Sequence, residues 1–479
     1  MNEKRETSPL EELDRSGLID LINELRELVK KQSEEIRSLR DQLNKNSRNS
    51  SKPPSSDGFK KPKSLREKGK RTLGGQLGHA GKTLYKVENP DVILPHLPQA
   101  CGYCQADLSE VGIEAVEKRQ VFDIVPAQIV VSEHHGMSKI CPCCGKQTQA
   151  VFPVGVDHSV QYGQYLRAQI AYLSSYQLIP TARLSELLTD FYGQTISEAT
   201  LLEVIADLSQ AVEPSLEGIK AGLLEAAVLH SDETSVRVDG KTEWLHVLSN
   251  QALTYYDVHE KRGQKATNSI GLIPEFTGYL LHDAFASYFV FEKCQHVLCN
   301  AHILRELTFL FEEQAQVWAG DLKELLLEIK RAVEQSHAQG RLTSEQLEGF
   351  GQRYAAIIGA GQHLNQAPIK PKKPQRGRQK QSPARNLLQR LEKYQAAILM
   401  FMHDFRVPFD NNLAERDLRM MKLKQKISGG FRTKRGAHLF ARVRSYISTV
   451  RKHGNNVLDA ISSALSGDPF IPHLRPMAE

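Results

Sequence analysis

Residues 224–307 constrain the fold most, because strand-like runs alternate there with turn signals. The Asp239-Gly240 pair lies between two runs of alternating apolar residues, which is a strong signal of a two-residue β-hairpin. A helical pattern follows through Asn300 and His302. Strands that alternate with helices predict an α/β domain. The further short strands are expected at residues 252–258, 279–282 and 296–299.

Acidic residues follow two strand-like runs, and a third lies on a basic helix. Asp232 follows the run 226–230, Asp283 follows the run 279–282, and Glu415 belongs to a helical stretch rich in Lys and Arg. A carboxylate at a strand end points out of the sheet into a crevice, and three converging carboxylates would hold Mg²⁺ (or Mn²⁺). We therefore predict that Asp232, Asp283 and Glu415 are metal ligands and catalytic residues in phosphodiester chemistry.

The third acidic position has competitors, Asp410 and Asp417. We favour Glu415 because Arg419 and Lys422, four and seven residues later, share its helix face and would meet DNA phosphates beside the metal. The bland alternative is an exposed Glu–Arg pair on a helix. Other cations that we expect to bind DNA are Lys60, Lys61, Lys70, Arg71 and Arg432.

The positive charge is concentrated in three blocks rather than spread evenly. The net charge is only +6, but residues 45–82, 370–380 and 415–452 are each strongly basic. Separated basic blocks suit a polyanion that runs over several domains, although any one block could be solvated surface or linker. No apolar run is long enough for a membrane span, and the polar N-terminus is not a secretory signal, so we expect a cytoplasmic protein with no membrane partner.

Two CxxC pairs predict a structural zinc site. Seven cysteines, an odd number, fit metal binding in a reducing compartment better than disulfides. The long spacer between the pairs has strand-like text at 120–125 and 129–132, which predicts a zinc ribbon with an inserted hairpin. Cys143 could replace a neighbour as a ligand, and buried apolar cysteines are the alternative. The expected Zn²⁺ ligands are Cys101, Cys104, Cys141 and Cys144.

The N-terminal part of the chain predicts a coiled coil, and residues 156–223 predict a helical domain. Leu18, Ile22, Leu25 and Val29 begin a heptad pattern, which favours self-association over packing on the same chain. A helix–turn–helix outline surrounds Ser197, but its second helix lacks Lys and Arg, so packing is favoured over DNA reading. The expected organisation is a coiled-coil helix (1–45), a flexible basic linker (46–90), a zinc module (91–155), the helical domain (156–223), an α/β domain (224–465) with a helical insertion at about 308–400, and a tail (466–479).

Several motifs occur together in a specific order. They are Asn49-Ser-Ser-Lys-Pro-Pro-Ser-Ser-Asp57, the cysteine pairs, Asp232-Glu-Thr, His282-Asp283, Cys299-x-x-His302, Asn412-Leu-Ala-Glu415-Arg, Ser428-Gly-Gly-Phe-Arg432, Gly436-Ala437 and Arg451-Lys-His-Gly454. With this ordered set, the chain resembles the bacterial transposases of the insertion sequence 66 family over nearly its whole length. One departure is that many members have Arg-Arg after the histidine, whereas Glu306 follows Arg305 here.

The resemblance implies a multidomain α/β protein with an RNase H-like DDE catalytic domain. It implies two divalent ions held by the three carboxylates, cleavage at transposon ends, and transfer of the 3′-hydroxyl into target DNA. The expected partners are transposon-end and target DNA, a second copy of the chain, and small accessory proteins of the element. The alternatives are a non-catalytic DNA-bridging protein and a structure-selective nuclease. Cys299 and His302 could bind a metal as a second pair, or pack beside the site.

Overall fold

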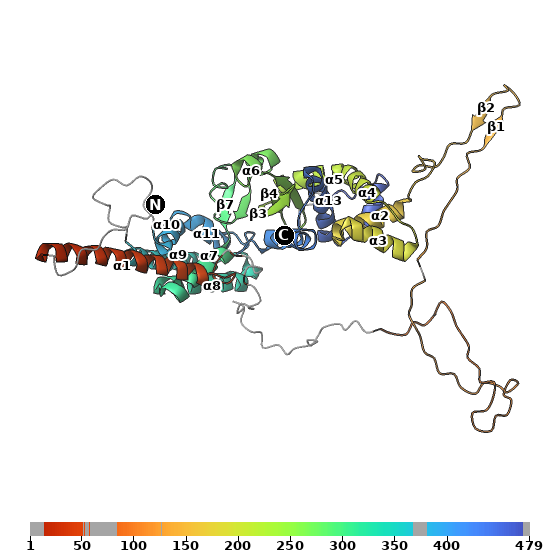
Figure 1. Ribbon diagram of the computed structural model, residues 1–479, viewed down its shortest axis with the longest axis horizontal. Helices are drawn as coiled ribbons and strands as arrows, with labels where there is room; N and C mark the ends of the chain where they lie inside the picture. Colours follow the sequence, from red (N-terminus) through yellow and green to blue (C-terminus); the bar gives the residue numbers. More distant parts are fainter. Residues whose placement is uncertain are drawn as a thin grey trace.

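The computed structural model describes residues 14–50, 52, 57, 84–125, 127–366 and 381–472. The sheet and its covering helices form the middle of the molecule, and helix α1 (Arg15–Asn44) lies at one end (Figure 1). The cysteine-rich segments run out at the other end. The expected DNA contacts of Lys60, Lys61, Lys70 and Arg71, and the basic run 370–380, lie outside the described residues.

A five-stranded mixed sheet is the centre of the fold. Its order is β5-β4-β3-β6-β7. Strands β3, β4 and β5 are antiparallel neighbours, whereas β6 runs parallel to β3 and β7 runs parallel to β6. The predicted α/β class is confirmed. The strands are β3 (Val228–Val238), β4 (Lys241–Ser249), β5 (Thr254–His259), β6 (Tyr279–His282) and β7 (Gln295–Leu298).

The predicted hairpin is present, and its turn has the expected backbone. Asp239 (φ 49°) and Gly240 (φ 69°) both have positive φ between β3 and β4, as the tight turns that match strand twist require. The expectation that Asp232 ends its strand was wrong, because β3 continues to Val238. Only residues 228–230 pair with β6, so the β6 side of β3 carries no strand beyond His230, while β4 pairs as far as Val238.

The two faces of the sheet are covered differently. On one face, apolar side chains such as Val236 and Val258 pack against helices α12 (Asn412–Ser428) and α13 (Lys434–Lys452). Side chains alternate along a strand, so Asp232 shares this face with Val236, whereas Glu233 points to the other. The other face packs against the loop region that follows α6 (Gln264–Ile270) and includes Phe276.

Residues 164–224 form helices that belong to the same core as the sheet. Ser197 caps α4 by accepting a hydrogen bond from the N–H of Thr200 (3.1 Å). The apolar face of α4 is buried in one cluster with α13, α14 (Val457–Leu465) and the sheet, so this helix packs in the core. The same cluster continues across residue 223, where the helical domain was expected to end. The helices are α2 (Gln164–Ala171), a π-helical turn (Tyr172–Tyr176), α3 (Thr181–Tyr192), α4 (Glu198–Ala211) and α5 (Glu213–Leu224).

A helical insertion separates β7 from α12. Its buried residues form a second cluster together with Leu281 of β6 and with Val297 and Leu298 of β7. The insertion therefore packs on the β6–β7 edge of the sheet. Its helices are α7 (Asn300–Gln314), α8 (Val317–Gln335), α9 (Ser344–Leu364), α10 (Pro383–Lys393) and α11 (Gln395–His403).

Helix α1 leaves its heptad face uncovered. None of its described residues is buried, and Ile22, Leu25 and Val29 are each about half exposed or more. The end of the helix contacts the insertion: Asp41 accepts a hydrogen bond from Gln314 (2.8 Å), and Lys45, the residue after the helix, lies over the ring of Phe309, 5.2 Å from its centroid. No described helix is both long and apolar enough to cross a membrane.

The strands of the cysteine-rich segment are not where the sequence pattern predicted them. Strands β1 (Ser138–Ile140) and β2 (Gln147–Gln149) flank the second CxxC pair, and 120–125 and 129–132 are not strands. The apolar residues Val121, Ile124 and Val131 are almost fully exposed, so these segments have no core to pack on. The second CxxC pair, Cys141–Cys144, forms the turn that connects β1 to β2; we call each CxxC turn a cysteine knuckle.

Candidate active site

The three predicted carboxylates belong to three different parts of the fold, and the charges of two of them act on the third, Asp232. Asp232 lies within β3, Asp283 follows β6 directly, and Glu415 is in the first turn of α12. Burial, followed by the charges of Glu233, Asp283 and Glu415, raises the pKa of Asp232 to about 8. The two distant acids are therefore close enough to Asp232 to disfavour its ionised form.

The three carboxylates do not yet have the spacing of ligands to a single ion. Among the described residues, one group has its potential metal-ligand atoms within 4.8 Å of one another, and it consists of Cys299, His302 and Glu415. A divalent cation bound beside Asp232 would offset the repulsion that, after burial, raises the pKa of this carboxyl. Asp232, Asp283 and Glu415 would hold it.

Asp283 is fixed by its own loop and by a nearby arginine. Its Oδ1 accepts a hydrogen bond from the N–H of Phe285 (3.0 Å), and its Oδ2 lies 3.9 Å from Arg262. Burial, followed by the charge of Glu233, raises the pKa of Asp283. The same arginine lies over the ring of Phe285, 4.1 Å from the centroid, so the loop after β6 is held from two sides.

An ion pair between buried Glu233 and partly exposed Arg262 lies behind the site, and sequence reasoning missed it. Glu233 accepts hydrogen bonds from Nε of Arg262 (2.6 Å) and from the hydroxyl of Tyr288 (2.5 Å). Its side chain is 1% exposed, so without Arg262 it would be an unpaired buried charge. No local pattern marks Arg262, since the pairing depends on contacts across the fold.

Asn411 connects the strand that carries Asp232 to the helix that carries Glu415. Its side-chain N–H donates to the carbonyl of Ser231 (2.8 Å), and its Oδ1 is 2.8 Å from Nδ1 of His230. Its backbone N–H donates to Sγ of Cys299 (3.2 Å), and its carbonyl accepts from the N–H of Glu415 (3.2 Å). This buried asparagine was also missed. Its only sequence signal is its place just before the predicted helix.

Glu415 is the acid of its helix that faces the site. Asp417 points elsewhere, because it accepts a hydrogen bond from Lys452 (2.9 Å). Asp410 accepts from the N–H of Asn412 (3.1 Å) and so caps the start of the helix. Glu415 instead lies 3.3 Å from Arg305. These contacts favour Glu415 over both competitors.

The departure at Arg305 and Glu306 has a structural account. Arg305 contacts Glu415, whereas Glu306 forms an ion pair with Arg390 of α10 (2.6 Å). The first arginine of the usual pair is thus kept at the site. The acidic second residue ties α7 to α10 within the insertion.

The predicted DNA-binding cations of the C-terminal part lie at the surface. Arg419, Lys422 and Arg432 are all exposed. Partial burial lowers the pKa of Lys422, while the charge of Asp232 acts in the opposite direction. Lys422 therefore lies near Asp232.

The two cysteine knuckles have the same backbone geometry. In the first, the N–H of Cys101 donates to Ala106 (2.9 Å) and Gln105 has φ 62°. In the second, the N–H of Cys141 donates to Lys146 (2.9 Å) and Gly145 has φ 66°. The second cysteine of the first knuckle is Cys104, and that of the second knuckle is Cys144.

Backbone hydrogen bonds prepare the first thiol of each knuckle for metal binding. N–H groups of Cys104 and Tyr103 lower the pKa of Cys101, and those of Cys144 and Cys143 lower the pKa of Cys141. Such turns stabilise thiolates, which is the form that binds zinc. Each knuckle offers two of the predicted sulfur ligands, and among the described residues no three of these sulfurs lie within 4.8 Å of one another.

Three protein-family models match parts of the chain. Residues 159–439 match the family model described as the transposase IS66 family, which is more than half of the chain. Residues 98–145 match the zinc-finger binding domain of the same transposases, and residues 7–84 match a family of unknown function. No curated protein matches the chain. The fold and site define a transposase-type α/β protein with a zinc-finger module. The chain belongs to the IS66 family of transposases.

Proposed function

We propose that the protein is a DNA transposase that cleaves transposon ends and transfers the 3′-hydroxyl strand into target DNA. The observation that carries this proposal is the meeting of three acids from β3, the β6 loop and α12, since the charges of Asp283 and Glu415 both act on Asp232. Family membership supports the same activity.

The sheet supports an RNase H-like assignment for the catalytic domain. A long central strand, β3, pairs with an antiparallel β4–β5 meander on one side and with parallel β6 and β7 on the other. In the proposed domain the first acid lies on this central strand, the second after the neighbouring parallel strand, and the third on a helix that covers the sheet. The order of the three acids along the chain is the one that a DDE transposase requires.

Each side chain has a proposed role in this chemistry. Asp232, Asp283 and Glu415 would hold two divalent ions, Mg²⁺ or Mn²⁺, which activate the attacking oxygen and stabilise the leaving oxygen. Asn411 keeps α12 against β3, and so sets the position of Glu415 relative to Asp232. Lys422 lies near the acids and would bind a DNA phosphate.

The remaining parts of the chain are proposed to organise the DNA complex. We expect the two knuckles to come together around one zinc ion held by Cys101, Cys104, Cys141 and Cys144. The free energy of zinc binding would stabilise this folded arrangement. The exposed heptad face of α1 would pair with a second copy of the chain, which would hide its apolar residues.

A cleavage and joining assay tests the catalytic proposal. Asp232→Asn, Asp283→Asn and Glu415→Gln should each abolish Mg²⁺-dependent cleavage and strand transfer, while binding to end DNA persists. Asp321→Asn, an exposed change on α8, is the matched control and should keep activity. Normal joining by any of the three variants removes that residue from the site. Nicks without joined products would instead favour a nuclease.

A zinc measurement tests the knuckle proposal separately. The Cys101→Ser, Cys104→Ser double variant should lose about one zinc per chain relative to the wild type. The wild-type zinc content in this double variant would contradict the assignment.

A further inference from the structure

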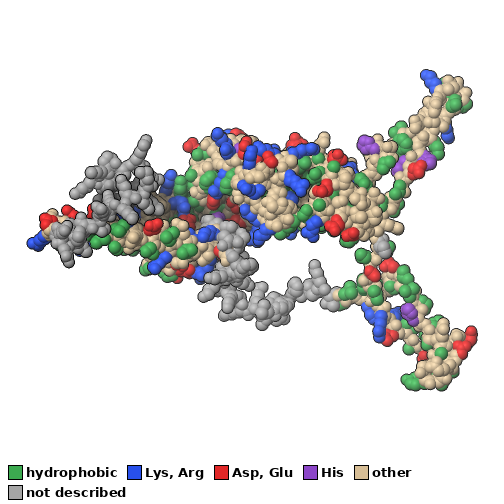
Figure 2. Space-filling model, in the orientation of Figure 1, with side chains coloured by type: hydrophobic (Ala, Val, Ile, Leu, Met, Phe, Trp, Pro, Cys, Tyr) green, Lys and Arg blue, Asp and Glu red, His purple; other side chains and the backbone are tan. Residues whose placement is uncertain are grey.

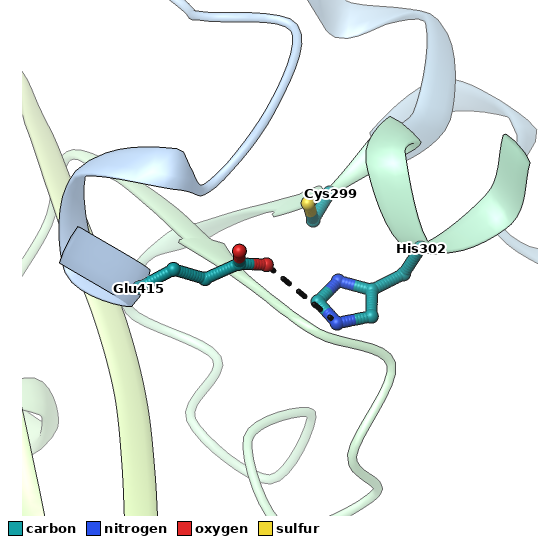
Figure 3. Close-up of side chains that lie close together, drawn as sticks. All are labelled: Cys299, His302 and Glu415. Carbon is teal, nitrogen blue, oxygen red and sulfur yellow. Dashed lines mark ion pairs between the residues drawn. The ribbon is translucent and has the colours of Figure 1, made fainter. Parts of the chain in front are cut away.

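The Cys299-x-x-His302 pair has a third potential ligand in the folded protein, Glu415 from α12. The three ligand atoms lie within 4.8 Å of one another, and Nε2 of His302 is 3.8 Å from Oε1 of Glu415. Figure 3 shows the three side chains pointing toward one another from the end of β7, the start of α7 and the start of α12. This convergence joins segments that are more than a hundred residues apart in sequence.

The geometry points to a second metal site at these three residues, one that takes Zn²⁺ or a similar transition metal ion. The inference that this ion then competes with catalytic Mg²⁺ for Glu415 rests on the proposed function. A Cys, His and carboxylate set is the donor type of zinc sites, whereas Mg²⁺ prefers oxygen ligands alone. The Cys299, His302 and Glu415 site would thus select Zn²⁺, the catalytic site would select Mg²⁺, and the two sites would share the carboxylate of Glu415.

The distances are close to those that a bound ion needs. With zinc–ligand bonds of about 2.0 to 2.3 Å in a tetrahedral site, ligand atoms lie about 3.3 to 3.8 Å apart. The separation of 3.8 Å between Nε2 of His302 and Oε1 of Glu415 already meets this spacing, and the other ligand atoms, all within 4.8 Å of one another, need only a small side-chain movement. Three protein ligands leave the fourth position of a tetrahedral ion open, as in sites where zinc binds water or substrate.

The surroundings leave ligand atoms available. Nδ1 of His302 is buried, and it has no hydrogen-bond partner among the residues that the structure describes. Unpartnered buried nitrogens are uncommon in folded proteins, and an ion would give this one a partner if Nδ1 is the ligand atom in place of Nε2, which faces Glu415. Sγ of Cys299 accepts a backbone N–H from Asn411 (3.2 Å), a contact that also suits a metal-bound thiolate.

Arg305 is the neighbour that opposes the ion. Its Nη2 lies 3.3 Å from Oε1 of Glu415, so a metal would either use the other carboxylate oxygen or displace the guanidinium. Either change alters how Glu415 faces Asp232. The expected consequence is that zinc inhibits the Mg²⁺-dependent reaction, and that more Mg²⁺ relieves the inhibition.

Metal content can be measured without any reaction. We would use the full-length chain with Ser in place of Cys101, Cys104, Cys141, Cys143 and Cys144, which removes every knuckle thiol, and titrate it with Zn²⁺ and with Co²⁺ as a spectroscopic probe. Cys299→Ser keeps an acceptor for the Asn411 N–H but removes the soft ligand, and His302→Asn removes the second ligand. The matched control is Cys294→Ser, a buried cysteine outside the group.

The expected result is one bound ion with a sulfur-to-cobalt charge-transfer band in the knuckle-free chain and in Cys294→Ser. That ion and the band should be lost in Cys299→Ser, and the ion should bind at least tenfold more weakly in His302→Asn. Equal metal content in Cys299→Ser and Cys294→Ser overturns the site.

The competition is tested on DNA cleavage with the knuckles intact. Zn²⁺ should inhibit the wild type, raising Mg²⁺ tenfold should restore cleavage, and Cys299→Ser should need more Zn²⁺ for the same inhibition. Inhibition that Mg²⁺ does not relieve overturns the competition. A wild type that binds cobalt through Cys299 but never cleaves DNA would refute the proposed function and leave the metal site standing.

Discussion

Replacing Asp232 by Asn should stabilise the metal-free protein while it abolishes the proposed reaction. Burial and three neighbouring acids raise the pKa of Asp232 from its ordinary value of 3.8 to about 8. A carboxyl with a raised pKa binds its proton more tightly in the folded chain than in the unfolded chain. It therefore lowers stability progressively as pH rises from about 4 to about 8, and the cost is constant above that range.

The size of the effect follows from the same shift. At pH 7 the unfolded chain has an ionised Asp232 and the folded chain a protonated one, and this difference costs about 4 kcal/mol. Asn has no such cost. Rearrangement and water entry around the charged carboxylate reduce the measurable gain, which we expect to be about 1 to 3 kcal/mol.

Tryptophan fluorescence offers a specific readout. Trp244 lies on β4 beside Arg262, with the guanidinium 5.0 Å from its ring centroid, and Trp318 can be changed to Phe so that Trp244 alone reports on the sheet. Urea unfolding of wild type and Asp232→Asn would be compared from pH 5 to pH 8, with Asp321→Asn as the control. Mg²⁺ should close the gap by stabilising the wild type, because only its carboxylates can bind the ion.

The reasoning would be refuted by a stability difference between the wild type and Asp232→Asn that stays constant from pH 5 to pH 8. It would also fail if Asp321→Asn showed the same pH-dependent gain. In either case Asp232 would not be under the combined influence of burial and the neighbouring acids.

Three further changes test the contacts around the site. Asn411→Ala should cost about 1 to 3 kcal/mol in urea unfolding, because it leaves buried partners unpaired, whereas exposed Asn412→Ala should be nearly neutral. Arg262→Met should cost about 3 to 5 kcal/mol by isolating the buried charge of Glu233, and adding Glu233→Gln should recover much of that loss; no recovery would contradict the pairing. Lys422→Ala should reduce the salt dependence of DNA binding by about one released counterion, and an unchanged slope would remove this residue from the DNA contact.

Local signals in the sequence predicted the hairpin, which is confirmed, and indicated three acidic candidates, whose catalytic role stays a prediction. The Asp239-Gly240 turn is encoded by its own backbone preferences, so it could be predicted without knowing the rest of the fold. The extent of β3 could not, because it depends on a change of neighbour from β6 to β4 near His230. The prediction of a strand at 120–125 was wrong for a related reason: residues with high β propensity form a strand only where they have a surface to pack on.

The contacts that support the acids could not be predicted because each joins distant segments. Asn411 reaches Ser231, and Arg262 reaches Glu233, through distances along the chain that no local pattern describes. The sequence motif did include Cys299 and His302, but not their proximity to Glu415. Residue type therefore indicated which chemistry to expect, while the fold decided which residues act together.

The helical insertion explains how Glu415 can be so far from Asp283 in sequence without losing its position. The chain enters and leaves the insertion at the same place: the N–H of Asn300 donates to the carbonyl of Phe409 (3.1 Å), and the N–H of Asn411 donates to Sγ of Cys299 (3.2 Å). The side chain of Asn300 also donates to Ile398 (3.0 Å), so the last helix is fixed to the entry point. Because the entropy of closing a loop grows only slowly with its length, these contacts matter more than the number of residues between them. It follows that the insertion can vary in length without moving Glu415, provided that the bonds of Asn300 and Asn411 persist.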